Sequence, residues 1–191
     1  MKKGYRMLGV AESFQKHVSK RSVLAGVVMR ADLIIDGFSF ALPTVGGMDA
    51  TEKLQDLYVS LEREDVNVLS VSGSVISWYN VIDFHRLHEE LGLPTISLTY
   101  DESEGLTEHF KRNFPEDWEE RVEVYRRNGE RFEVGLKTGF EVYVRGYGVD
   151  VEETTGILNA FTIQGRYPEP IRIARLMSHS MAKAYGSLLA R

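Results

Sequence analysis

Short apolar runs without helical spacing dominate the first forty residues. The run Ser22–Met29 is nearly continuous and rich in β-branched residues, which is typical of a buried strand. Tyr5–Val10 is a shorter apolar run, and Leu33–Leu42 alternates more loosely between apolar and polar positions. A turn at Ala31–Asp32 would join the second and third runs as a hairpin. The pattern therefore predicts three sequential, antiparallel strands at the start of the chain.

A helix is predicted after Gly46–Gly47, because apolar residues recur at helical spacing from Leu54 to Leu61. Asp49 stands where its N-cap would be, and Glu52 stands where a capping box places an acid. Strand-like and helix-like segments then alternate, which predicts parallel strands joined by crossover helices. The later predicted strands cover residues 67–71 and 94–100, the helices 81–91, 106–114, 117–126, 150–161 and 168 onward, and a peripheral hairpin 131–136 and 142–145.

This order of elements predicts an α/β protein with the RNase H-like architecture. Its mixed five-stranded sheet would start as a three-strand antiparallel meander and continue with parallel strands, flanked by helices. A doubly wound fold would instead open with a strand–helix–strand unit. No linker, internal repeat or low-complexity segment interrupts the sequence, so we expect a single domain over residues 1–191.

The composition of the chain limits the classes of protein to which it can belong. It has 191 residues, with 43% hydrophobic and 27% charged residues, which is the balance of an ordinary globular protein. The absence of Cys excludes disulfides, thiolate metal sites and a Cys nucleophile. No apolar run approaches the roughly 20 residues that span a bilayer, and no signal-peptide segment follows the basic start. We therefore expect a cytoplasmic protein with no membrane partner.

Charge is distributed unevenly along the chain. The net charge of −5 is not that of a basic nucleic-acid-binding protein. Residues 1–30 nevertheless carry seven Lys or Arg against one acid, and residues 166–191 carry five against one. If the two terminal segments meet in space, they form a basic face. The alternative interpretation is that these charged residues are ordinary solvent-exposed surface residues with no binding role.

Several short segments together resemble a family of archaeal proteins, the endonuclease dU family, which is similar in fold to endonuclease V. None of the segments is specific alone, but their shared order and spacing carry the resemblance over nearly the whole chain. They are Gly26–Arg30, Gly47–Glu52, Gly73 with Asn80–Asp83, Gly92–Pro94 and the Pro-Glu-Pro motif of Pro168–Arg172.

The resemblance implies a metal-dependent nuclease acting on nucleic acid that contains deaminated bases, as in DNA repair. Acids at the strand ends would hold Mg²⁺, with Mn²⁺ as a substitute, because this hard ion takes oxygen ligands. The ions position a water and stabilise the leaving oxygen of a phosphodiester. In this chain Glu12 and Asp49 would be the metal ligands and catalytic acids, Glu169 a supporting catalytic acid, and Arg172 a phosphate contact.

The chain departs from the family pattern at the acids themselves. Ala11–Glu12 stands where the family has paired aspartates, and Gly46 and Ser72 stand at two further acidic positions. Arg175 aligns with a late histidine. An alternative function is therefore a non-catalytic relative that binds nucleic acid or a partner protein and has lost the metal site. A third hypothesis, a small-molecule-binding protein or structural dimer, also stays open.

Other residues have both a functional and a structural interpretation. Lys20 and Arg21, together with Arg172 and Arg175, would bind nucleic acid if they share one face. Arg172 could equally pair with Glu169 on its own helix. Tyr79 and Asn80 lie in a loop where an aromatic ring could stack on a base or pack into the core. The sequence leaves open whether the protein forms a homo-oligomer.

Overall fold

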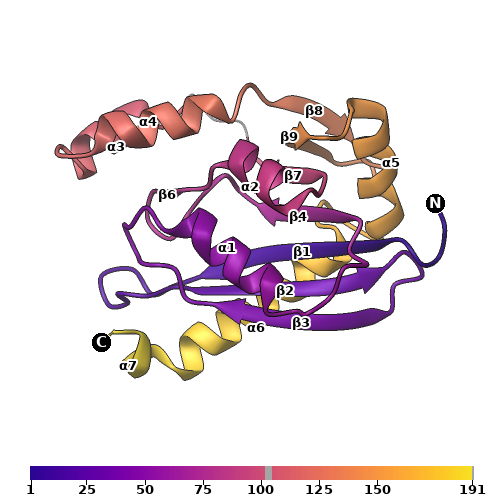
Figure 1. Cartoon of the computed structure of the whole chain (residues 1–191), viewed down its shortest axis with the longest axis horizontal. Coiled ribbons are helices and arrows are strands. Elements are labelled where there is room, and N and C mark those ends of the chain that lie inside the picture. The colour runs from indigo at the N-terminus through magenta and orange to yellow at the C-terminus, as the bar shows by residue number, and fades with distance from the viewer. Residues whose placement is uncertain (102–104, 191) are drawn as a thin grey trace.

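A seven-stranded mixed sheet runs through the middle of the molecule in the order β3-β2-β1-β4-β7-β9-β8 (Figure 1). The structure is a computed structural model that describes residues 1–101 and 105–190. The strands are β1 (Arg6–Ser13), β2 (Val23–Arg30), β3 (Ile35–Ala41), β4 (Val68–Ser72), β7 (Thr95–Thr99), β8 (Phe132–Gly135) and β9 (Glu141–Tyr147). A separate two-stranded ribbon pairs β5 (Val75–Ile76) with β6 (Asn80–Val81).

Strand directions follow the sequence prediction at the centre of the sheet. β1, β2 and β3 form an antiparallel meander, and β1, β4 and β7 are parallel. The predicted count of five strands is wrong, since the hairpin expected to be peripheral belongs to the main sheet. β9 pairs antiparallel with β7, with Thr95 opposite Tyr147, and β8 then pairs with β9. The free edge of β7 offers unpaired backbone groups, and β9 satisfies them.

Helices cover both faces of the sheet (Figure 1). α1 (Ala50–Val59) and α2 (Phe84–Leu91) pack over one face, where alternate strand residues such as Leu8, Leu24 and Leu69 are buried. α5 (Val151–Phe161) and α6 (Glu169–Ala184) cover the other face, and the short α7 (Gly186–Leu189) follows. α3 (Thr107–Asn113) and α4 (Trp118–Arg127) extend to one side and pack around β6. In the described part of the chain, no helix is long and apolar enough to span a membrane.

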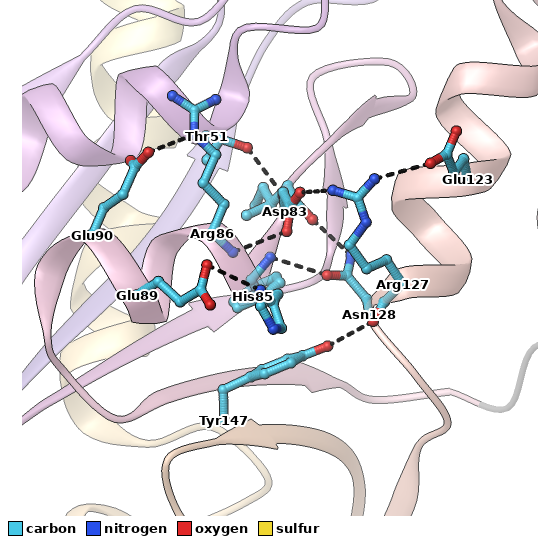
Figure 2. A network of polar contacts seen from close by, with 12 residues as sticks. Thr51, Asp83, His85, Arg86, Glu89, Glu90, Glu123, Arg127, Asn128 and Tyr147 are labelled. Carbon is cyan, nitrogen blue, oxygen red and sulfur yellow. Dashed lines mark hydrogen bonds and ion pairs between the residues drawn. The ribbon is translucent and has the colours of Figure 1, made fainter.

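A polar network fixes α2 against α4 (Figure 2). Asp83 caps α2, which begins later than the predicted residue 81, by accepting a hydrogen bond from the backbone N–H of Arg86 at 3.0 Å. Its second oxygen accepts from Arg127 of α4 at 2.8 Å. Asn128 accepts from the N–H of Phe84 and donates to the carbonyl of Ile82. The network therefore holds the α3–α4 arm at a fixed position beside the sheet.

The start of α6 lies directly on β1, at Gly9. A Cβ atom at this position would stand 2.6 Å from the backbone nitrogen of Ile171 and 2.7 Å from the carbonyl carbon of Pro170. Only glycine permits this approach, because neither backbone atom can move away without displacing the helix. α6 is thereby held close to the strand that carries Glu12.

Gly9→Ala is expected to lower the free energy of unfolding by about 1 to 3 kcal/mol, the usual effect of overpacking a core. Denaturant unfolding measures the change. Gly135→Ala is the matched control, since a Cβ atom at that strand glycine meets nothing within 4 Å. An equal loss in both variants would show that the effect is one of strand glycines in general and not of the contact with α6.

Candidate functional site

A cleft of about 660 Å³ opens where the parallel strands β1 and β4 end. The carboxyl ends of parallel strands are where sheets of this kind hold ligands. Glu12 of β1 and Ser72 of β4 lie on its sheet side, and the ribbon residue Ile76 lies beside them. α6 forms the opposite wall and contributes Arg172, Arg175 and His179. The cleft thus combines one acid from the sheet with three basic side chains from a single helix.

Glu12 is largely buried at the sheet side of the cleft. Its Oε1 accepts a hydrogen bond from the backbone N–H of Ser77 at 3.2 Å, and its Oε2 is buried without a partner among the described residues. Burial raises the pKa of Glu12 from 4.5 to about 7, although the Ser77 N–H acts in the opposite direction. A substantial fraction of Glu12 is therefore neutral near pH 7.

Asp49 is held by a different set of contacts. Its carboxylate accepts from the backbone N–H and the hydroxyl of Thr44, at 3.0 and 2.7 Å, and from the side-chain amide of Asn80 at 2.8 Å. Arg21 lies 3.6 Å away. Burial acts to raise the pKa of Asp49, but the hydrogen bonds from Thr44 and Asn80 outweigh it and hold the pKa below its usual range. Asp49 is an ionised acid whose acceptor positions are occupied by the protein itself.

The prediction that Asp49 caps α1 is wrong. Asp49 precedes the helix but makes no side-chain hydrogen bond to its first turn. The cap comes instead from Asn80, which lies 31 positions after Asp49. Its side-chain oxygen accepts a hydrogen bond from the backbone N–H of Ala50 at 3.0 Å. Glu52 pairs with Arg86 instead of completing a capping box. Asn80 is completely buried, so this residue is not available to nucleic acid as the sequence suggested.

These residues do not fit a magnesium site of several carboxylates. Asp49 already accepts hydrogen bonds at both oxygens, and Glu12 offers one free oxygen on a carboxyl whose pKa is raised. Among the described residues, no three His, Asp or Glu side chains are grouped so that they could hold a metal ion. Glu12 and Asp49 accept hydrogen bonds from Ser77 and Asn80, two residues three positions apart in the β5–β6 hairpin.

The predicted supporting acid, Glu169, is a buried partner of Arg172. Its Oε2 accepts from Nε of Arg172 at 2.8 Å, and this pairing raises the pKa of Arg172. Arg172 still lines the cleft with a side chain that is 43% exposed. Glu169 is therefore placed to orient an arginine, and both interpretations offered for Arg172, an ion pair and a ligand contact, are compatible with its position.

Arg175 is the freer of the two cleft arginines. It lies one turn beyond Arg172 and is exposed, with its guanidinium 4.4 Å from the ring centre of Tyr167. Tyr167 in turn packs on Tyr100, at 4.3 Å between ring centres. Stacking against an aromatic face restricts the guanidinium without occupying its hydrogen-bond donors. Arg175 can thus present those donors to an anion in the cleft.

A strained loop directly follows Ile76, which lines the cleft. Ser77, Trp78 and Tyr79 all have left-handed backbone conformations, with φ values of 47°, 59° and 66°. Such a conformation costs roughly 1–2 kcal/mol for each non-glycine residue. Arg121 of α4, which is buried, donates to the carbonyls of Gly46, Gly47 and Tyr79 at 2.8–3.0 Å. The loop is therefore held in place by a side chain from the α3–α4 arm.

The other predicted nucleic-acid contacts are only partly available. Tyr79 packs among Trp78, Phe110 and Phe114 and stacks on His109 with an interplanar angle of 18°. Its ring thus serves an internal aromatic cluster. The guanidinium of Arg21 donates to Thr44, close to Asp49.

Lys20 is exposed beside α7, where its backbone N–H donates to the carbonyl of Leu189. It therefore lies near the far end of the α6–α7 segment from Arg172.

Two residues of the site were not predicted from the sequence. His179 follows Arg175 by four positions, and this spacing on a predicted helix was the available signal. Arg121 has a partner at helical spacing in Asp117, but the carbonyls through which it reaches the site are more than 40 positions away and gave no signal.

Solved structures place the fold in a class. The chain superposes on a protein of unknown function from Archaeoglobus fulgidus with a TM-score of 0.80 and 25% identity, covering 93% of this chain and 98% of the other. It superposes on endonuclease V of Ciona intestinalis with a TM-score of 0.64 and 15% identity, covering 94% and 86%. The predicted RNase H-like fold, in the form found in endonuclease V, is confirmed.

Sequence comparison specifies the family. The family described as endonuclease dU matches residues 3–182. A UPF0215 protein of Pyrobaculum calidifontis is 35% identical over 171 residues, which cover 90% of this chain and 93% of that relative. The chain belongs to the endonuclease dU family, as the sequence motifs indicated.

Proposed function

We propose that this protein binds nucleic acid in the cleft between α6 and the ends of β1 and β4. Arg172 and Arg175 would contact backbone phosphates there, beside Glu12. One observation carries the proposal: the cleft sets two arginines and a histidine against one acid whose pKa is raised. Such a charge balance favours a phosphate oxyanion, which accepts charge-assisted hydrogen bonds from guanidinium donors.

Family and fold support the class of ligand. The chain belongs to a family named for an endonuclease. The Ciona intestinalis endonuclease V of the same fold was solved with a DNA that contains inosine. Fold alone does not assign a function, but here the cleft lies at the strand ends and carries phosphate-binding side chains.

The same cleft favours binding without metal-dependent cleavage. A two-metal mechanism needs several carboxylates free to share the ions. In this chain Asp49 is engaged by Thr44 and Asn80, and among the described residues Glu12 is the one acid that lines the cleft. We therefore infer a nucleic-acid-binding relative in which basic side chains of α6 face strand ends that have lost most of the acids of the family pattern.

A binding and cleavage assay on the same samples tests the proposal. Labelled single- and double-stranded DNA with uracil or hypoxanthine is incubated with Mg²⁺ or Mn²⁺. We expect salt-sensitive binding and no metal-dependent cleavage, with Asp49→Asn leaving both unchanged. Metal-dependent cleavage that Glu12→Gln abolishes would instead establish a nuclease working with a reduced set of acids.

Replacing Arg175 is expected to weaken DNA binding about tenfold, the loss of roughly 1.4 kcal/mol of a charge-assisted hydrogen bond. Arg175→Lys should recover only part of the affinity, because an ammonium lacks the planar set of donors. Fluorescence anisotropy at fixed salt measures both. Arg126→Ala on α4 is the control, since this arginine lies outside the cleft. Unchanged affinity in Arg175→Ala would refute the assignment of the cleft.

A further inference from the structure

Basic side chains continue along α6 beyond the cleft. Arg172, Arg175, His179 and Lys183 follow one another at intervals of three or four residues, so they lie on one stripe of the helix. Arg175, His179 and Lys183 are exposed, and the buried residues of α6 occupy a different stripe. The acid on this helix, Glu169, is buried at its start. Because Glu169 pairs with Arg172, the positive charge of the stripe beyond the start of the helix comes from Arg175 and Lys183.

The loop between β1 and β2 lies beside the second half of this helix. The side-chain amide of Gln15 donates to the carbonyl of Ala182 at 3.4 Å, and Lys20 donates from its backbone to Leu189 at 2.8 Å. Residues 13–22 contain Lys16, Lys20 and Arg21 but no acid. This loop thus adds a second basic segment next to the α6 stripe.

The lysines of both segments are available to a ligand. Lys16, Lys20 and Lys183 are exposed, and none of the three pairs with a carboxylate of the described residues. The ammonium of Lys16 lies 4.3 Å from the ring centre of Trp78, which positions it toward the loop that borders the cleft. A track defined by Arg172, Arg175, His179, Lys183, Lys16 and Lys20 therefore runs from the cleft toward α7.

The length of this track suits a nucleic-acid strand. Eleven positions separate Arg172 from Lys183, which corresponds to about 16 Å along the helix axis. One strand of a nucleic-acid helix carries a phosphate about every 3.4 Å, so the track matches about five nucleotides. A ligand confined to the cleft would leave the lysines of the track unused.

We propose that one strand of the bound nucleic acid leaves the cleft and follows this track along α6, with Lys16, Lys20 and Lys183 contacting its phosphates. The proposal rests on the proposed function, because the strand enters from the cleft. It adds a minimum ligand length and three further contacts. It also implies that much of the affinity is independent of base sequence, as phosphate contacts are.

The test compares the triple variant Lys16→Ala/Lys20→Ala/Lys183→Ala with the wild type and with Lys137→Ala, an exposed lysine in the loop after β8. Binding of a 12-nucleotide and a 3-nucleotide single strand is measured from 50 to 200 mM salt. For the longer strand, the slope of log K against log salt should fall by about 2 in the triple variant, at about 0.7 per lysine. The trinucleotide should bind the triple variant and the wild type alike.

An unchanged slope in the triple variant would overturn the track while leaving the proposed function intact. Equal losses in Lys137→Ala would also overturn it, because net charge and not position would then set the affinity. Competition of the 12-mer by poly-glutamate at equal charge would point to an acidic protein as the ligand of the track. If the wild type binds neither strand, the proposed function itself fails.

Discussion

Arg121→Ala is expected to lower the free energy of unfolding by about 3 to 5 kcal/mol, as is found when one partner of a buried ionic network is removed. The guanidinium is 2% exposed and pairs with Asp117 at 2.6 Å. It also donates to carbonyls of the two loops on which Asp49 and Tyr79 lie. Its removal leaves three carbonyls without these donors and releases a loop with three left-handed residues.

Urea unfolding followed by circular dichroism measures this loss. Arg126→Ala is the control on the same helix, because its side chain is exposed. Substitutions at exposed positions of this kind usually change stability by less than about 0.5 kcal/mol. A loss below 1 kcal/mol in Arg121→Ala would show that the loops hold their conformation without the guanidinium.

Stability is expected to fall between about pH 4.5 and pH 7 because of Glu12, and Glu12→Gln should remove this dependence. The pKa of Glu12 is raised from 4.5 to about 7 in the folded protein. Below pH 4.5 the carboxyl is protonated in both states, and its full contribution is present. As the pH rises, the unfolded chain loses this proton first, so the contribution is lost progressively up to the folded pKa. The shift corresponds to about 3 kcal/mol.

The measurement is the difference in unfolding free energy between wild type and Glu12→Gln at a series of pH values from 4 to 8. Both proteins share every other titrating group, so the difference isolates Glu12. As the pH rises over this range, the wild type should lose about 3 kcal/mol of unfolding free energy relative to Glu12→Gln. Parallel curves would show that Glu12 has an ordinary pKa and is ionised in the cleft.

Periodicity along the sequence located most helices and strands. The run at residues 22–29 became β2 at Val23–Arg30, and the helix predicted over 150–161 is α5 at Val151–Phe161, which Asp150 caps by accepting from the N–H of Glu153 at 2.8 Å. The hairpin of β8 and β9 was recognised but placed outside the sheet. An apolar pattern indicates that a strand is buried, but it does not indicate which neighbour pairs with it.

Less of the candidate site could be predicted from the sequence. The motifs identified the family and placed Arg172 and Arg175 on one helix. The role of Asp49 was not predictable, because the side chain that caps α1 comes from Asn80, far along the chain. The raised pKa of Glu12 likewise depends on burial in the folded chain, where its one hydrogen bond comes from Ser77, 65 positions away.

Helix α6 packs against the sheet with one stripe of residues and lines the cleft with another. Ile171, Ala174 and Ser178 are buried against the sheet, whereas Arg175 and His179 face the cleft. Substitutions on the outer stripe can change the preferred ligand with little effect on folding, because surface changes are usually worth less than 0.5 kcal/mol. Ligand choice in such a helix is therefore free to diverge while the scaffold stays the same, and a protein built this way can acquire a new role without first becoming unstable.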